Sequence, residues 1–193
     1  MRATHSGTCQ ICGASQLLPG GVLAKHGYTT RWGFFSGTCR GSGHQPFEQS
    51  ILMIEDAIAQ AEDDARRLRK NAADHRASTD PAGIPFQVYH VGRDRRGSYR
   101  WVVADITATE HPYSSGTGSY LKFFATYTPV GEQEAVTKPV DTYGHYTLEA
   151  QVAYLRGLAA ANLEQNAANL DRYVAWQRAR ITDWQPTELA VRS

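Results

Sequence analysis

The chain has 193 residues, of which 41% are hydrophobic and 20% charged, and its formal net charge is +1. This composition is typical of a globular protein and excludes a disordered chain, and the balanced charge gives no general attraction to nucleic acid. Its longest aliphatic run, Ile51–Ile54, is far too short to span a bilayer, so we expect no membrane partner. No secretory leader is evident and the cysteine count is odd, which predicts a cytoplasmic protein with reduced thiols.

Residues 1–46 form the first predicted part, rich in Gly, Ser, Thr and Cys. Two short apolar pieces, 22–24 and 33–35, are expected to be strands of a small ribbon. A piece of this size cannot bury a core of its own, and below about 40 residues a metal or disulfides usually supply the stability. We therefore expect a zinc-binding module here.

The metal prediction comes from cysteine spacing. Cys9 and Cys12 form a C-x2-C pair, whose two thiolates point at one centre, and Cys39 with His44 forms a C-x4-H pair. His26 lies midway between them and competes with His44 for the fourth place. Three thiolates and one imidazole are a common ligand set for structural zinc. The sequence leaves the choice between His26 and His44 open.

Two other uses of these cysteines have less support. A redox C-x2-C pair lies at a helix start within a βαβ unit, and nothing of that kind is predicted around Cys9. Catalytic zinc needs an open position and a nearby carboxylate base, for which Glu48 is the only acid close in sequence.

Residues 47–193 are predicted to be a long antiparallel helical hairpin, with helices over 47–77 and 147–184 and a three-stranded antiparallel sheet over 84–128 inserted at its turn. Apolar residues recur every three or four positions in both helical segments. The first helix is expected to begin with Pro46 at its first turn, and the second with Thr147 as its N-cap. The predicted class is therefore α+β. A homodimer through the long helices is a further hypothesis.

One part of the sequence resembles a known group of proteins. The segments "CQIC", "GGVLAKHGY" and "GTCRGSGHQPFEQS", together with a long C-terminal helix ending in Trp184–Pro186, are similar to small zinc-finger-like proteins of bacteriophages and bacterial mobile elements. The resemblance covers the N-terminal third and the C-terminal helix. It implies a metal-binding N-terminal piece and a mobile-element origin, and it implies no activity.

Other constellations provide weaker candidates. Basic residues interleaved with Tyr99 and Trp101 could contact nucleic acid through the predicted hairpin: Arg93, Arg95, Arg96 and Arg100. A polar line on the second helix could recognise a partner or fix helix register: Asn162, Asn166, Asn169 and Tyr173. His111 and His145 lie near acids, but no nucleophile elbow or phosphate-binding loop accompanies them.

These patterns favour a non-enzymatic protein of a phage or mobile element, acting in a bacterial host cell through contacts with another macromolecule. A protein partner, such as a host defence complex that it inhibits or modulates, is the main hypothesis. A zinc-containing nucleic-acid-binding regulator and a metal-dependent hydrolase are the alternatives.

Overall fold

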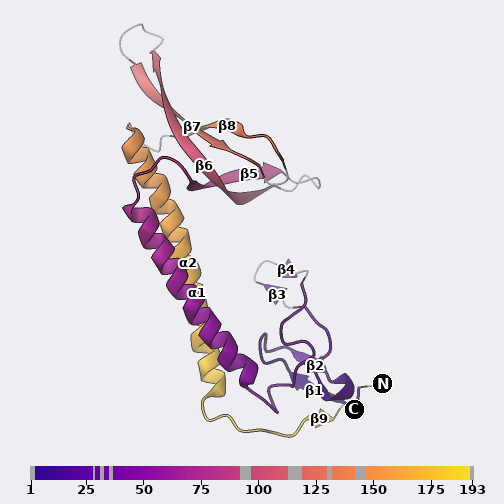
Figure 1. The fold of residues 1–193 in the computed structure, drawn as a ribbon. Coiled ribbons are helices and arrows are strands. Elements are labelled where there is room, and N and C mark those ends of the chain that lie inside the picture. The colour runs from indigo at the N-terminus through magenta and orange to yellow at the C-terminus, as the bar shows by residue number, and fades with distance from the viewer. Residues whose placement is uncertain are drawn as a thin grey trace. The chain divides into compact units, whose positions relative to one another are not determined.

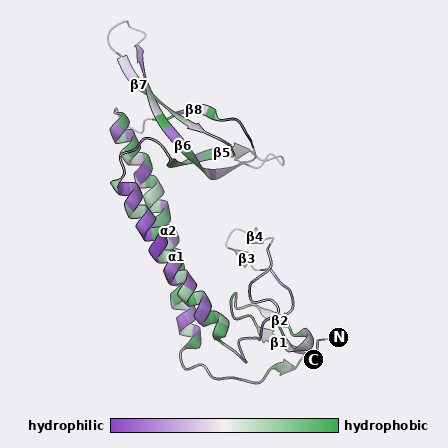
Figure 2. Cartoon of the chain, viewed as in Figure 1, coloured by the Kyte–Doolittle hydropathy of each residue, from purple (hydrophilic) through white to green (hydrophobic). Residues whose placement is uncertain are grey.

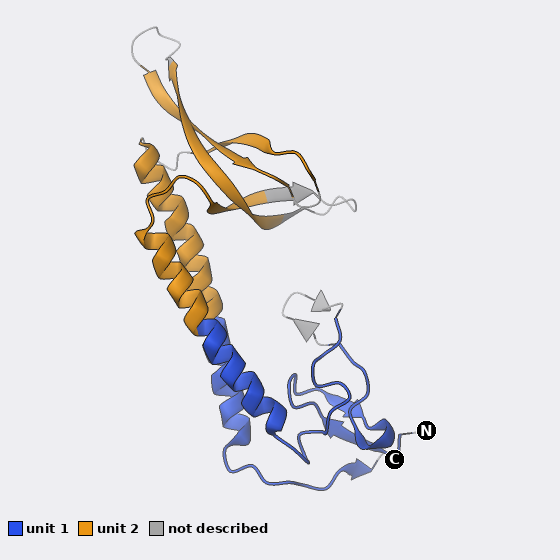
Figure 3. Cartoon of the chain, in the orientation of Figure 1, with its two compact units in different colours: residues 1–65, 168–193 blue, residues 66–167 orange. Residues whose placement is uncertain are grey.

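The computed structural model describes residues 3–27, 29–30, 33–34, 37–91, 97–112, 119–129, 132–141 and 147–191. These residues hold two long helices and antiparallel sheets, which confirms the α+β class (Figure 1). The chain forms two compact units, residues 1–65 with 168–193 and residues 66–167 (Figure 3). The boundaries between the units fall inside the two helices, whereas the predicted division followed residue 46.

Unit 1, residues 1–65 with 168–193, contains a three-stranded antiparallel sheet in the order β2-β1-β9. Strand β1 is His5–Thr8, β2 is Ser15–Leu17 and β9 is Ala190–Val191, so the two ends of the chain pair in one sheet. A short 3-10 helix, η1, covers Pro19–Gly21. Strands β3, Thr29–Thr30, and β4, Gly33–Phe34, form a separate two-stranded ribbon.

The predicted ribbon of residues 22–24 with 33–35 is therefore wrong in its first member. Residues 22–24 are not a strand, and β4 pairs with β3 instead. Leu23 is buried with Leu18, Cys9 and Cys39, so this apolar piece forms the small core of the module. Its backbone makes single hydrogen bonds, such as Leu23 N–H to the His44 carbonyl at 2.9 Å, rather than a ladder.

Helix α1 is Leu52–Ala77 and begins five residues later than predicted. Residues 47–49 form a turn whose ends are held by other elements: the Phe47 N–H donates to the Thr8 carbonyl at 2.8 Å, and the Glu48 carbonyl accepts from the Thr187 N–H at 2.8 Å. The Gln10 side chain then accepts a hydrogen bond from the Met53 N–H at 3.1 Å. Pro46 consequently precedes the helix and does not lie in its first turn.

Within unit 1, the first part of α1 packs against the last part of α2, which is Leu148–Ile181. Ile54, Ile58, Ala61 and Val174 form the buried seam, and Glu62 makes an ion pair with Arg178. Hydrophobic and hydrophilic residues are interspersed along both helices (Figure 2).

Unit 2, residues 66–167, contains an antiparallel meander in the order β5-β6-β7-β8. The strands are β5, Ile84–Val91; β6, Gly97–Pro112; β7, Ser119–Tyr127; and β8, Val136–Val140. The first three strands were predicted; the fourth, β8, was not. Alternate residues of the sheet, among them Ala104, Ile106, Phe123 and Ala125, pack with Val152 and Leu155 of α2 in one apolar core.

The N-terminal part of α2 is fixed to unit 2 by polar contacts as well. The Thr147 hydroxyl accepts a hydrogen bond from the Ala150 N–H at 3.2 Å, which is the predicted N-cap. The buried Arg156 guanidinium donates to the carbonyls of Asp80, at 3.0 and 2.7 Å, and Ala82, at 2.9 Å. Arg76 of α1 makes an ion pair with Glu164 of α2.

Candidate metal centre

The ligand atoms of four side chains in unit 1 converge. Those of Cys9, Cys12, His26 and Cys39 all lie within 4.8 Å of one another, which is close enough to hold a metal ion. The sulfurs of Cys9 and Cys39 are 3.8 Å apart, and the sulfur of Cys12 is 3.5 Å from Nε2 of His26. Cys9 and Cys39 are buried, whereas Cys12 and His26 are half-buried.

The first two cysteines lie in the tight loop between β1 and β2. The Cys9 carbonyl accepts a hydrogen bond from the Gly13 N–H at 3.0 Å, and the Cys9 N–H donates to the Ala14 carbonyl at 2.9 Å. Gly13 has a φ of +74°, a conformation that residues with a Cβ rarely adopt. This closed loop turns the backbone amides of Ile11 and Cys12 toward the Cys9 sulfur.

Cys39 begins a second turn of the same kind, in which the Ser42 N–H donates to the Cys39 carbonyl at 3.0 Å. Gly41 in this turn lies against the first loop, because a Cβ at position 41 would come within 2.3 Å of the Cys9 sulfur. Only glycine lets the two turns approach so closely without moving a sulfur.

The structure places His26, and not His44, beside the sulfurs. Nδ1 of His26 lies 2.8 Å from the Ala24 carbonyl and 3.2 Å from the Ser42 hydroxyl. A carbonyl can only accept, so Nδ1 carries the proton and Nε2 presents its lone pair to the cluster, as metal-bound histidines do. The His44 side chain is exposed and does not belong to this group of ligand atoms.

Burial raises the pKa of the Cys9 thiol above its ordinary value, and it raises that of Cys39 to about 12 although the Gly41 N–H favours the Cys39 thiolate. The neighbouring thiols contribute to both of these pKa shifts, because adjacent thiolates repel each other. Without a cation these thiols are therefore protonated at neutral pH. A bound divalent cation would replace the protons and offset the repulsion.

The C-terminal end of α2 binds the backbone of the first cysteine loop. The buried Gln177 amide donates to the Ile11 carbonyl at 3.1 Å, and the Arg180 guanidinium donates to the carbonyls of Gln10, at 2.7 Å, and Cys9, at 3.2 Å. Arg180 also lies over the rings of Phe47, at 4.6 Å, and Trp176, at 4.7 Å. Burial lowers the pKa of Arg180, which nevertheless stays charged.

Sequence reasoning missed this support. Gln177 interrupts the apolar spacing of the second helix, and Arg180 is followed by the predicted helix stop, but neither pattern indicates a contact with residues 9–11. The available signal for this contact was Gln177 itself, a polar residue at a position of an otherwise apolar seam.

Glu48, the acid considered as a base for catalytic zinc, has a structural role. The Glu48 carboxylate accepts hydrogen bonds from the Thr8 N–H, at 3.1 and 2.9 Å, and from the Thr8 hydroxyl at 2.6 Å. It fastens the turn before α1 to β1.

Several of the remaining sequence candidates lie outside the part of the chain that the structure describes. Arg93, Arg95, Arg96 and His145 lie outside the described residues, and Arg100 is exposed on β6. His111 on β6 contacts the rings of Tyr120 and Phe124.

The polar line on α2 is divided between the two units. Asn162 and Asn166 belong to unit 2, and Asn169 and Tyr173 to unit 1. Tyr173 is half-buried, and its hydroxyl accepts a hydrogen bond from Gln177 at 2.8 Å. Asn169 accepts one from Arg172.

Comparisons with protein-family models, with curated proteins and with solved structures found no match for this chain. In the described part of the chain, neither long helix has a stretch apolar enough to cross a membrane. Function is therefore argued from the geometry of the chain itself.

Proposed function

We propose that Cys9, Cys12, His26 and Cys39 bind one structural zinc ion. The supporting observation is the spacing of the ligand atoms. Two sulfurs about 2.3 Å from a tetrahedral zinc lie roughly 3.8 Å apart, and a sulfur and a histidine nitrogen lie roughly 3.5 Å apart. The separations in the chain are 3.8 Å for Cys9 with Cys39 and 3.5 Å for Cys12 with His26.

Such a zinc would be structural rather than catalytic. Four protein ligands complete a tetrahedron and leave no position for water or substrate. Glu48, the base that a hydrolase would use, already accepts three hydrogen bonds from Thr8. The chain is therefore proposed to be non-enzymatic, and a metal-dependent hydrolase has less support.

The zinc module would act as a knuckle at the base of a long helical hairpin. The ion pairs support the hairpin, since Glu62 pairs with Arg178 in unit 1 and Arg76 with Glu164 in unit 2. The interval from Glu62 to Arg76 on α1 equals the interval between their partners Arg178 and Glu164 on α2. The two intervals run in opposite directions along the chain. Antiparallel packing produces this relation.

The proposed activity is binding of another macromolecule, with a protein as the main partner, in the cytoplasm of a bacterial host. The origin in a phage or mobile element, and the inhibition or modulation of a host defence complex, come from the sequence resemblance. Homodimer formation through the long helices remains part of the proposal.

The nucleic-acid alternative has one observation in its favour. Arg100 is exposed on β6 between Tyr99 and Trp101, which are both exposed. If nucleic acid were the partner, the logarithm of the affinity would fall steeply with the logarithm of the salt concentration. A titration with single-stranded and duplex DNA at several salt concentrations tests this, and no binding at low salt rejects it.

The zinc proposal is tested by measuring metal content after replacing each histidine in turn. We expect His26→Ala to lower the zinc content or the zinc affinity by about 10- to 100-fold or more, while the matched variant His44→Ala keeps one zinc per chain. Native mass spectrometry counts the bound metal and identifies it by mass. Full zinc in His26→Ala, or a wild-type unit 1 that is equally stable with and without metal, would contradict the proposal.

A further inference from the structure

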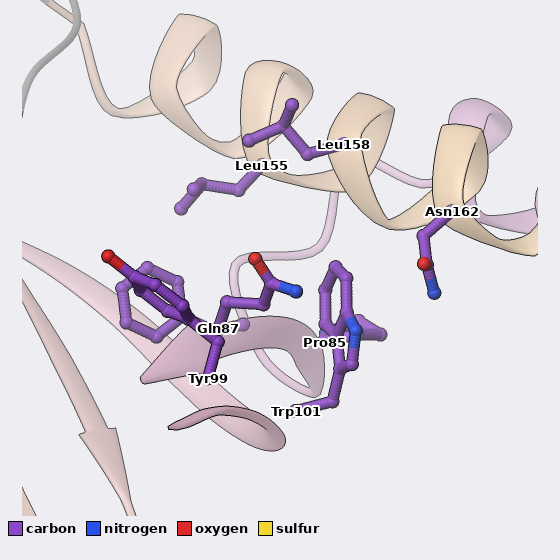
Figure 4. A pocket seen from close by; sticks show the side chains of 8 residues that line it. Pro85, Gln87, Tyr99, Trp101, Leu155, Leu158 and Asn162 are labelled. Carbon is purple, nitrogen blue, oxygen red and sulfur yellow. The ribbon is translucent and has the colours of Figure 1, made fainter. Parts of the chain in front are cut away.

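Unit 2 carries a cavity of about 320 Å³ between β5, β6 and α2. Figure 4 shows Leu155 and Asn162 of α2 pointing toward the side on which Gln87, Tyr99 and Trp101 lie. The cavity is lined by Pro85, Phe86, Gln87, Tyr99, Trp101, Leu155, Leu158 and Asn162. Its size is at the lower end of the range for cavities that bind ligands.

Exposed apolar side chains are concentrated here. Tyr99 is 69% exposed, Leu158 45% and Trp101 37%, and Val103, 67% exposed, lies two residues beyond Trp101 on the same strand. Single exposed apolar residues are ordinary, but several at one concave place are typical of an interaction surface. An apolar partner would remove these side chains from water.

The polar groups of the cavity are uncharged. Among the described residues no acidic or basic side chain lines it, so these residues would offer a charged ligand group no counter-charge. The carboxamides of Gln87 and Asn162 have no hydrogen-bond partner within the described part of the chain. Each offers a donor and an acceptor, which matches a ligand that itself carries both, as a peptide group does.

The neighbouring strand supplies the second half of the argument. Strand β5 is the edge of its sheet, since it pairs only with β6 in the described meander. Pro85 has no N–H, and proline in a sheet is tolerated where its nitrogen faces the open side of an edge strand. Backbone groups two residues apart point the same way, so the N–H and C=O of Gln87 also face the open side.

From these observations we infer that the cavity and the open edge of β5 together bind an extended, uncharged, apolar peptide segment of a partner protein. The peptide adds a strand to β5 through main-chain hydrogen bonds. Alternate side chains of the peptide enter the cavity, where Tyr99, Trp101 and Leu158 cover them. This inference rests on the proposed function in one respect, because it names the chemistry of the protein partner.

Two other occupants fit less well. A nucleobase could stack on Trp101, but it brings a phosphate, and none of the described residues that line the cavity is a cation. A second copy of this chain could pair edge to edge along β5, but that would leave the cavity itself unfilled. Both occupants are outcomes that the experiment detects.

The experiment is a selection from a displayed library of random 12-residue peptides on the full-length, metal-loaded protein. The matched variants are Leu158→Asp, which places a charge in the cavity, and Leu52→Asp, which places one at an exposed leucine of unit 1. We expect enriched peptides to be apolar, uncharged and prone to form strands. Leu158→Asp should weaken their binding at least about tenfold, whereas Leu52→Asp should change it less than about twofold.

A synthetic copy of an enriched peptide, N-methylated at alternate residues, tests the main-chain contacts without altering the protein. We expect methylation on one set of alternate residues to lower affinity at least about tenfold, and methylation on the other set to have little effect. Equal loss with either set, or no loss with both, would overturn strand addition.

The remaining outcomes also decide the question. If no peptides are enriched on the wild-type protein relative to the Leu158→Asp protein, the inference is overturned. It is also overturned if a random 12-nucleotide single strand shifts the Trp101 indole signal in an NMR spectrum. Concentration-dependent dimers that Gln87→Pro abolishes would assign the edge to a second copy. Zinc content is measured in the same samples, so failure of the peptide inference with zinc present is distinct from failure of the metal proposal.

Discussion

In unit 2 the largest fully buried side chains are mostly apolar, with Phe123, Ile84 and Val152 at the centre of the core. In unit 1 the corresponding set includes Leu23, Ile54 and Pro46, and with them Cys9, Cys39, Gln10 and Gln177. Unit 2 is therefore stabilised mainly by removing apolar area from water, whereas unit 1 combines apolar seams with directed bonds to backbone groups and to the proposed metal. The difference predicts that unit 1 depends on a bound metal and that unit 2 does not.

The largest effect is expected from removing the metal. A chelator should strongly reduce the protection of amide hydrogens in residues 9–27 and 37–48, because zinc contributes much of the folding free energy of small zinc modules. Residues 119–127, in β7, should keep their protection. Hydrogen-exchange mass spectrometry measures both segments at once, and added zinc should restore the first. An equal loss of amide protection in β7 would show that unit 2 depends on the metal as unit 1 does.

The converse change is Phe123→Ala in the core of unit 2. Phe123 is fully buried in the sheet core, and truncating a buried phenylalanine to alanine costs roughly 3–5 kcal/mol. Chemical denaturation followed by circular dichroism measures this loss. Zinc content should stay at one per chain, and a milder Phe123→Leu change should cost less. Loss of zinc in Phe123→Ala would contradict the comparison.

The two states of unit 1 should respond to pH in opposite directions. In the metal-free protein, the pKa of Cys39 is raised from the ordinary 9.0 to about 12, so the fold favours the neutral thiol. The stability that this supplies is present below pH 9 and is lost as the pH rises toward 12. With metal bound, protons compete for the thiolates, so stability falls as the pH falls.

Denaturation of unit 1 across the pH range, with and without chelator, measures the two slopes. A metal-loaded protein that is destabilised by alkali in the same way as the metal-free one would indicate that the sulfurs are not ligands.

A smaller effect is expected at the contact between α2 and the first cysteine loop. Gln177→Leu keeps a buried side chain of similar size but leaves the Ile11 carbonyl without its donor, which costs about 1–3 kcal/mol. The loss should appear in unit 1 and should be accompanied by faster zinc release to a chromogenic chelator. Gln185→Leu, at an exposed position after the helix, is the control and should change neither. An unchanged rate of zinc release in Gln177→Leu would show that this hydrogen bond does not stabilise the metal centre.

These contacts explain how far the sequence could be interpreted. Cysteine spacing predicts three of the four converging ligand atoms. Cys9 and Cys12 are three residues apart and converge locally, and Cys39 was expected to begin the second pair. Spacing could not choose between His26 and His44, since both lie among glycines. The choice depends on the Ala24 carbonyl and the Ser42 hydroxyl, which fix the ring of His26.

The elements follow the same rule. Apolar periodicity predicted both helices and the strands β5, β6 and β7, whose patterns are local. It missed the late start of α1, which is set by contacts of Phe47 and Glu48 with Thr8 and Thr187, distant in sequence. It also missed β8, a five-residue strand whose Lys138 and Pro139 give little strand signal. The cavity beside β5 could not be predicted because it depends on α2 lying next to that strand.

The smallest predicted effect sharpens the comparison from the side of unit 2. Thr147→Ala removes the hydroxyl that accepts the Ala150 N–H at 3.2 Å, and loss of an N-cap costs about 1 kcal/mol. Because the start of α2 lies in unit 2, amide protection should fall in residues 148–152 and stay unchanged in residues 9–27 and 37–48, with full zinc. Thr147→Ser retains a hydroxyl and should restore the protection. If Thr147→Ala instead accelerated exchange around the cysteines, the two ends of α2 would be coupled, and the metal would stabilise the sheet unit as well as its own.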